Sequence, residues 1–128
     1  MNVYDKIYLL GKSLPENSSL EVLPSDLYTC TAKNNKSRNQ ENFSEAVAWA
    51  ISNGLMSISP KTNKFVINQH SLVRSDALQK EMGVDRFAFR NLTNRAGAKA
   101  IFREPKNGAK GYFTTSDAKA IMRAKLGV

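Results

Sequence analysis

Residues 75–94 read Ser-Asp-Ala-Leu-Gln-Lys-Glu-Met-Gly-Val-Asp-Arg-Phe-Ala-Phe-Arg-Asn-Leu-Thr-Asn, and this segment carries the strongest local signal in the chain. Apolar residues recur at helical spacing on both sides of Gly83, which predicts one helix ending at Met82 and a second over 84–96. Glycine readily adopts the positive φ at which helices end, so we expect Gly83 to form the bend between them. Ser75 is placed to cap the first helix, because its hydroxyl can accept a hydrogen bond from the helix N-terminus.

A β-hairpin is predicted to follow these two helices. Strand-like segments over 99–103 and 110–114 flank an Asn-Gly dipeptide at 107–108, which suits a tight turn with positive φ. A last helix is expected over 117–126, because its apolar residues again form one face. Residues 70–128 are therefore expected to form a module of two helices, a hairpin and a closing helix.

The first half of the chain shows the same order of elements. We expect a helix over 3–14, a short helix within 20–32, an exposed polar loop over 33–42, a helix over 42–53, and strands over 55–58 and 64–67. The predicted fold is thus helix-rich α+β, with two small helix–helix–hairpin modules in tandem, residues 1–69 and 70–128.

Positive charge is concentrated in the second module. Residues 1–69 hold 7 Lys and Arg against 6 Asp and Glu, whereas residues 70–128 hold 12 against 5, so the net charges are +1 and +7. A basic module of this kind favours a nucleic-acid partner, because the phosphate backbone attracts Lys and Arg and releases counterions on binding. Charge alone does not distinguish DNA from RNA.

The bend at Gly83 and its surroundings resemble a helix-turn-helix. In that family a glycine separates two helices, and apolar residues at fixed places around it pack the pair into a corner. Gln79 departs from the family pattern, which usually has a small residue there, and Asp85 stands where a small or hydroxyl residue often caps the second helix. The matching apolar positions are Leu78, Met82, Val84, Phe89 and Leu92, with the small residue Ala77 on the first helix.

Together with the hairpin, residues 75–114 resemble the winged-helix family of DNA-binding proteins. The resemblance implies that the second helix enters the major groove and that the hairpin, the wing, lies along the phosphate backbone. The helix has a buried arc and an opposite arc of Arg, Asn and Phe, side chains that suit guanine, adenine and the thymine methyl group. The predicted DNA-binding residues are Arg86, Phe87, Arg90, Asn91, Asn94 and Arg95 on the helix, and Lys99, Arg103, Lys106 and Lys110 on the hairpin.

Other interpretations stay open at this point. Arg and Asn are common on solvated helix faces, and Lys often guards edge strands. A basic RNA-binding or ribosome-associated module is one alternative, because Tyr112 and Phe113 point to opposite faces of their strand and an exposed ring would stack on a base. An adaptor for a host protein such as RNA polymerase is another. Trp49 lies off the main apolar stripe and is the candidate protein contact, although packing within the protein explains it as well. The helix over 42–53 carries no Arg or Lys and is not expected to read DNA.

Several function classes are disfavoured by what the sequence contains. Cys30 is the only cysteine and His70 the only histidine, so neither a disulfide framework nor a zinc site of the usual type is expected, and Cys30 is expected to be buried. Neither catalytic motifs nor cofactor-binding motifs occur, so we expect no enzyme. No apolar run or signal peptide predicts a membrane partner, which favours the cytoplasm. The expected function is sequence-specific binding of double-stranded DNA, as a small transcriptional regulator of phage or plasmid type; a homodimer is compatible with it.

Overall fold

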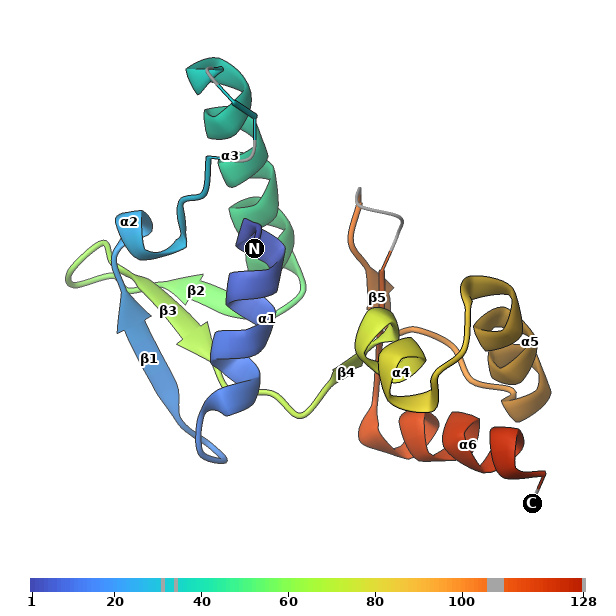
Figure 1. Cartoon of the computed structure of the whole chain (residues 1–128). Coiled ribbons are helices and arrows are strands. Elements are labelled where there is room, and N and C mark those ends of the chain that lie inside the picture. Colours follow the sequence, from blue (N-terminus) through green and yellow to red (C-terminus); the bar gives the residue numbers. More distant parts are fainter. Residues whose placement is uncertain (31, 34, 106–109, 128) are drawn as a thin grey trace. The chain divides into compact units, whose positions relative to one another are not determined.

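The computed structural model describes residues 1–30, 32–33, 35–105 and 110–127 (Figure 1). The chain divides between His70 and Ser71 into two compact units. The described residues form helices and two small three-stranded antiparallel sheets, one sheet in each unit. The expectation of a helix-rich α+β fold is therefore confirmed.

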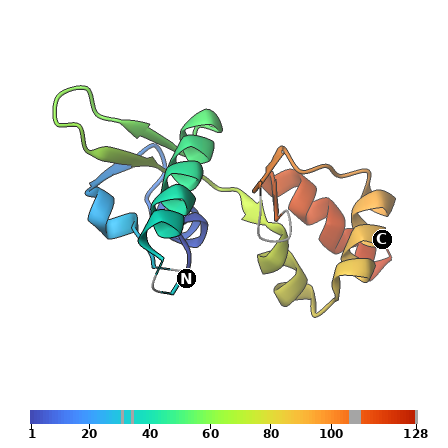
Figure 2. The ribbon, with the colours of Figure 1, turned by 90° about the horizontal axis from the view of Figure 1, so that it is seen from above.

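The first unit contains a three-stranded sheet whose strand order is β1-β3-β2. Its helices supply Ile7, Tyr8 and Ala46 to a core that also holds Met56 and Ile67 from the sheet. The hairpin of β2 and β3 extends to one side of this unit (Figure 2). Its elements are α1 (Val3–Ser13), β1 (Ser19–Val22), α2 (Pro24–Leu27), α3 (Lys36–Ser52), β2 (Met56–Ile58) and β3 (Phe65–Asn68).

The expectation of a helix within 20–32 is wrong for its first part. β1 pairs antiparallel with β3, with Val22 opposite Phe65, and only the single turn of α2 is helical. Pro24 explains this change of structure, because it disfavours helical geometry in the preceding residue while suiting the first turn of a helix. Cys30 follows α2 and is exposed rather than buried as expected, because its segment packs through other side chains such as Tyr28, whose ring contacts Phe43.

The polar loop expected over 33–42 is also wrong, because α3 begins at Lys36. The side chain of Asn35 caps the helix by accepting a hydrogen bond from the backbone N–H of Arg38 at 3.0 Å. Asn39 is buried, and its amide accepts from the backbone N–H of Ala32 at 2.7 Å and donates to the Ala32 carbonyl at 3.0 Å. The polar residues are thus held in helical form by a cap and a tertiary contact, and α3 carries two cations that were assigned to a loop.

The sheet of the second unit runs β4-β6-β5. As in the first unit, the third strand along the chain lies between the first and the second. In the first unit β1 pairs with β3, the last strand of the hairpin, and in the second unit β4 pairs with β6 in the same way. Neither β1 nor β4 was expected. The predicted turn at 107–108 lies outside the described residues. The elements of this unit are β4 (Val73–Arg74), α4 (Ser75–Met82), α5 (Arg86–Ala96), β5 (Phe102–Arg103), β6 (Gly111–Phe113) and α6 (Thr115–Leu126).

Gly83 and Gly97 end the two helices of the expected corner. Their φ values are 65° and 67°, in the left-handed region that glycine adopts without strain. Gly83 therefore forms the bend between α4 and α5, and Gly97 starts the return of the chain toward β5. The closing helix α6 is capped by Thr114, whose hydroxyl accepts from the backbone N–H of Asp117 at 3.2 Å.

Candidate nucleic-acid interface

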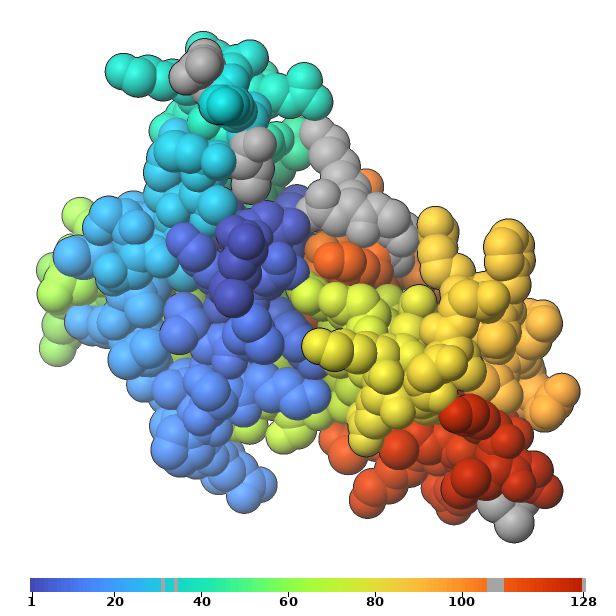
Figure 3. Space-filling view, in the orientation of Figure 1, coloured from blue at the N-terminus to red at the C-terminus, as the bar shows by residue number. Residues whose placement is uncertain are grey.

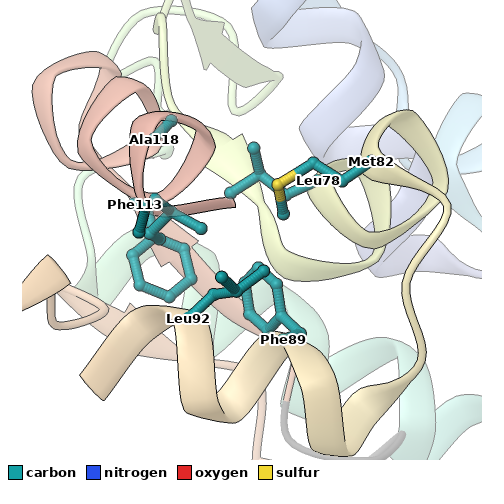
Figure 4. Packing of buried hydrophobic residues seen from close by; sticks show 8 residues of the cluster. Leu78, Met82, Phe89, Leu92, Phe113 and Ala118 are labelled. Carbon is teal, nitrogen blue, oxygen red and sulfur yellow. The ribbon is translucent and has the colours of Figure 1, made fainter. Parts of the chain in front are cut away.

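Helix α5 forms part of the surface of the second unit (gold in Figure 3). Its inner face packs on the core through aromatic side chains. Phe89 and Leu92 point from α5 toward Phe113, Leu78 and the neighbouring helices (Figure 4). The rings of Phe89 and Phe113 meet edge to face, with centroids 5.9 Å apart. This contact fixes the rotation of α5 and hence determines which of its residues face outward.

The N-terminus of α5 is held by Asp85. Its carboxylate oxygen Oδ1 accepts a hydrogen bond from the backbone N–H of Ala88 at 2.8 Å, which is the geometry of an N-cap. Aspartate at this position departs from the usual helix-turn-helix residue but caps the helix. The position of α5 is thus set at its N-terminus by Asp85 and along its length by the core.

The outward face of α5 brings together the six residues predicted for this helix. All six are exposed, and Phe87 is 79% exposed, which is unusual for so large an apolar side chain. The helix contains no Asp or Glu between its ends. The six residues are Arg86, Phe87, Arg90, Asn91, Asn94 and Arg95.

A groove of about 480 Å³ runs along one flank of α5. Arg86 and Arg90 of α5 line it together with Arg103 of β5, so three guanidinium groups from two elements meet there. Phe89 and Phe113 contribute aromatic surface. The remaining lining residues, Ser75, Gln79, Phe87 and Thr93, add no negative charge. The groove can therefore hold an anionic ligand. It was not predictable from the sequence, because its walls come from four separate elements.

The position of Arg103 depends on the strand opposite. Arg103 pairs with Gly111 in the β5–β6 ladder. A Cβ atom at position 111 would lie 3.1 Å from Nη1 of Arg103 and 2.8 Å from Cβ of Ala100. The absence of a side chain at Gly111 thus leaves the space that the Arg103 guanidinium occupies as it crosses the hairpin.

The other predicted hairpin residues differ in their surroundings. Lys99 is exposed in the segment before β5. Lys110 is half-buried, and its Nζ lies 3.7 Å from Oδ2 of Asp76, so part of its charge is balanced within the unit. Lys106 lies outside the described residues.

Beneath the hairpin lies a buried charged network that the sequence analysis missed. Arg74 binds Asp76 through two nitrogens, Nε at 2.7 Å and Nη2 at 2.9 Å, and its Nη1 lies 3.2 Å from Oε2 of Glu104. The hydroxyl of Tyr112 donates to the same Glu104 oxygen at 2.7 Å. Glu104 is 1% exposed, and its carboxylate is paired with Arg74 in the interior.

The surroundings of these groups shift their pKa values. Burial raises the pKa of Glu104, although the Tyr112 hydrogen bond and the Arg74 charge act in the opposite direction. Burial would raise the pKa of Asp76 too, but the hydrogen bonds and charge of Arg74 lower it overall. Burial also raises the pKa of Tyr112, which therefore remains a hydrogen-bond donor. Tyr112 and Phe113 are both buried, so neither provides an exposed ring for stacking.

Trp49 is half-buried within the first unit. Its ring packs edge to face against Tyr4 of α1, with centroids 5.3 Å apart. The tryptophan therefore contributes to the packing of α3 on α1.

His70 ends the first unit and lies against α1, with its Nε2 atom 2.9 Å from the carbonyl oxygen of Tyr8. Burial lowers the pKa of its imidazole.

No protein-family model matches the chain, and neither the curated proteins nor the solved structures contain a match. Within the described ranges, no helix has the length and apolar character needed to cross a membrane. Nor do three or more His, Cys, Asp or Glu side chains come together in these ranges in a way that could hold a metal ion.

Proposed function

We propose that the protein binds double-stranded DNA through the outward face of α5. The observation that carries the proposal is the set of exposed Arg, Asn and Phe side chains on a helix without acidic residues, beside a groove lined by three arginines. Affinity for DNA comes largely from phosphate contacts, and sequence preference comes from contacts to base edges. This surface offers side chains for both kinds of contact.

In this proposal the centre of the exposed face reads bases. Arg90 can make two parallel hydrogen bonds to guanine, Asn91 and Asn94 can do the same for adenine, and Phe87 can contact the methyl group of thymine. The core contact between Phe89 and Phe113 supports this role, because a helix that reads bases must hold its side chains at a fixed rotation.

The hairpin acts as a wing that binds the backbone. Arg103 and Lys99 are placed for phosphate contacts, and Lys106 remains a candidate of the same kind. Lys110 contributes less, because Asp76 balances part of its charge. The order helix, helix, hairpin and the strand that joins the hairpin support the resemblance to the winged-helix family. On this basis we infer a small cytoplasmic transcriptional regulator of phage or plasmid type that acts without catalysis.

A second candidate function is binding of single-stranded RNA or DNA. The 79% exposure of Phe87 favours it, because an exposed ring beside arginines can stack on an unpaired base. A role as an adaptor for a host protein such as RNA polymerase draws less support, since Trp49, the residue predicted for it, packs on Tyr4.

Selection from random pools tests the proposal. Duplex DNA, single-stranded DNA and RNA pools are offered to the full chain at several salt concentrations, and the retained fractions are sequenced. We expect salt-dependent retention of duplex DNA with one enriched motif, and a palindromic motif would indicate a homodimer. Preferential retention of RNA or single strands would favour the second candidate, and no retention of any pool would contradict both.

A further inference from the structure

Helix α5 has a hollow on its second flank as well. This shallow hollow, of about 680 Å³, lies between α5 and α6. Arg95 of α5 and Arg123 of α6 line it together with Ala96, Ala120, Ala124 and Gly127. Small residues keep it open, and none of these six described lining residues is acidic. Arg123 was not among the predicted DNA-binding residues, because it lies on the closing helix and outside the resemblance to a helix-turn-helix.

The two hollows lie on opposite sides of the exposed face. Successive helical residues are rotated by about 100°, so Arg86 and Arg95, nine positions apart, point in directions that differ by about 180°. Arg86 lines the groove shared with Arg103, whereas Arg95 lines the hollow shared with Arg123. Asn94, at about 80° from Arg86, lies between them and lines neither hollow. The helix therefore has a central exposed crest, with a cationic groove along the flank of Arg86 and a cationic hollow beside its last turn on the flank of Arg95.

This arrangement matches the cross-section of a major groove. An α-helix with its side chains is about 10–12 Å across, and the groove is about 12 Å wide, so an inserted helix fills it. The crest then faces the base edges, and each flank faces one of the two sugar-phosphate strands. On one flank Arg86 of α5 lies beside Arg103 of β5, with Arg90 about 40° from Arg86 toward the crest. On the other flank Arg95 of α5 lies beside Arg123 of α6.

We propose that the two hollows receive the two opposite phosphate strands of one major groove. Arg86 and Arg103 bind one strand, and Arg95 and Arg123 bind the other, which makes Arg123 a DNA-binding residue on α6. This inference rests on the proposed binding of duplex DNA by α5 and adds the second strand to it. The Arg123 side chain is exposed, and its Nε lies 3.5 Å from the carbonyl oxygen of Lys119.

A structural role is the competing explanation for these arginines. Arg95 and Arg123 both lie in the last turn of their helices, where a cation interacts favourably with the helix dipole. Such a role would affect helix stability but would not change the number of phosphates bound. The salt dependence of DNA binding separates the two explanations, because it reports phosphate contacts.

The test measures affinity of the full chain for a labelled DNA duplex of mixed sequence over a range of salt concentrations. Arg123→Gln is compared with Lys119→Gln, which removes an exposed cation of the same helix that lines neither hollow. We expect Arg123→Gln to reduce the slope of log K against log salt by about 0.9 and Lys119→Gln to leave it unchanged. Because Arg103 is assigned to the other strand, Arg103→Gln combined with Arg123→Gln should reduce the slope by about 1.8.

The outcomes separate this inference from the proposed function. If the wild-type chain binds the duplex but Arg123→Gln behaves like Lys119→Gln, the assignment of the second strand is wrong and the proposed function stands. A double variant no more affected than either single variant would equally overturn it, because the two arginines would then share one contact. If the wild-type chain does not bind the duplex, both the proposed function and this inference fall.

Discussion

Arg74 and Glu104 form an ion pair in the interior of the second unit, with Nη1 of Arg74 3.2 Å from Oε2 of Glu104. The two residues are 6% and 1% exposed. Arg74 ends β4 and also binds Asp76 in the first turn of α4, while Glu104 follows β5 and accepts a hydrogen bond from Tyr112 of β6. This pair therefore ties the hairpin that carries Arg103 to the start of the helical corner.

Replacing Glu104 with alanine should strongly destabilise the second unit. The substitution leaves the Arg74 charge buried without one of its two carboxylate partners, and removing one member of a buried pair typically costs about 3–5 kcal/mol. Glu104→Gln should cost less, because the amide oxygen can still accept from Tyr112. Hydrogen exchange of amides in α4, α5 and β6 measures the effect. An alanine variant as stable as the wild-type chain would show that the pair does not stabilise the unit.

The capping role of Asp85 at the start of α5 can be tested separately from the charge of Asp85. Asp85→Ala removes the acceptor for the backbone N–H of Ala88 and should cost about 0.5–2 kcal/mol, whereas Asp85→Asn keeps an acceptor and should cost little. Both variants remove a negative charge beside the proposed DNA surface, so both should bind duplex DNA more tightly. Thermal unfolding and a DNA titration at fixed salt measure the two effects. Weaker binding by the stable Asp85→Asn variant would contradict the placement of DNA beside this end of α5.

The stability of the first unit should fall on mild acidification. Burial lowers the pKa of His70 below the ordinary value of 6.5, so the unfolded chain binds a proton more readily than the folded one. This contribution to the free energy of unfolding is fully present above 6.5, and is lost as the pH falls from 6.5 through the lower pKa of the folded state. Fluorescence of Trp49, the only tryptophan, follows urea unfolding of this unit at pH 7.5 and at pH 5.5. His70→Gln should show a smaller difference between the two, and an equal difference would rule out His70 as its source.

Much of the second unit was predictable because local signals agree with its packing. The apolar spacing around Gly83 and the glycine at 97 specify both helix ends without reference to the rest of the chain. β4 was not predictable, because its two residues become a strand only by pairing with Tyr112 and Phe113, far along the chain. The start of α3 was missed for a similar reason, since buried Asn39 holds it through Ala32.

The candidate site, too, was predictable only where it depends on local sequence signals. Periodicity alone identified the exposed face of α5, because its buried arc is apolar. The flanking hollows depend on Arg103 and Arg123, which other elements bring beside α5. Likewise, the pairing of Lys110 with Asp76 and of Arg74 with Glu104 arises from tertiary contacts, which a count of charges along the hairpin cannot reveal.

The most direct test of base reading by α5 compares Arg90→Ala with Lys80→Ala in binding to the duplex enriched by selection. Arg90 stands on the exposed face of α5, whereas Lys80 is an exposed cation of α4 that lines neither hollow. We predict that Arg90→Ala weakens binding roughly 5- to 150-fold and relaxes preference at one base pair, while Lys80→Ala has little effect. Equal losses from the two variants, with sequence preference intact, would contradict the claim that α5 reads DNA.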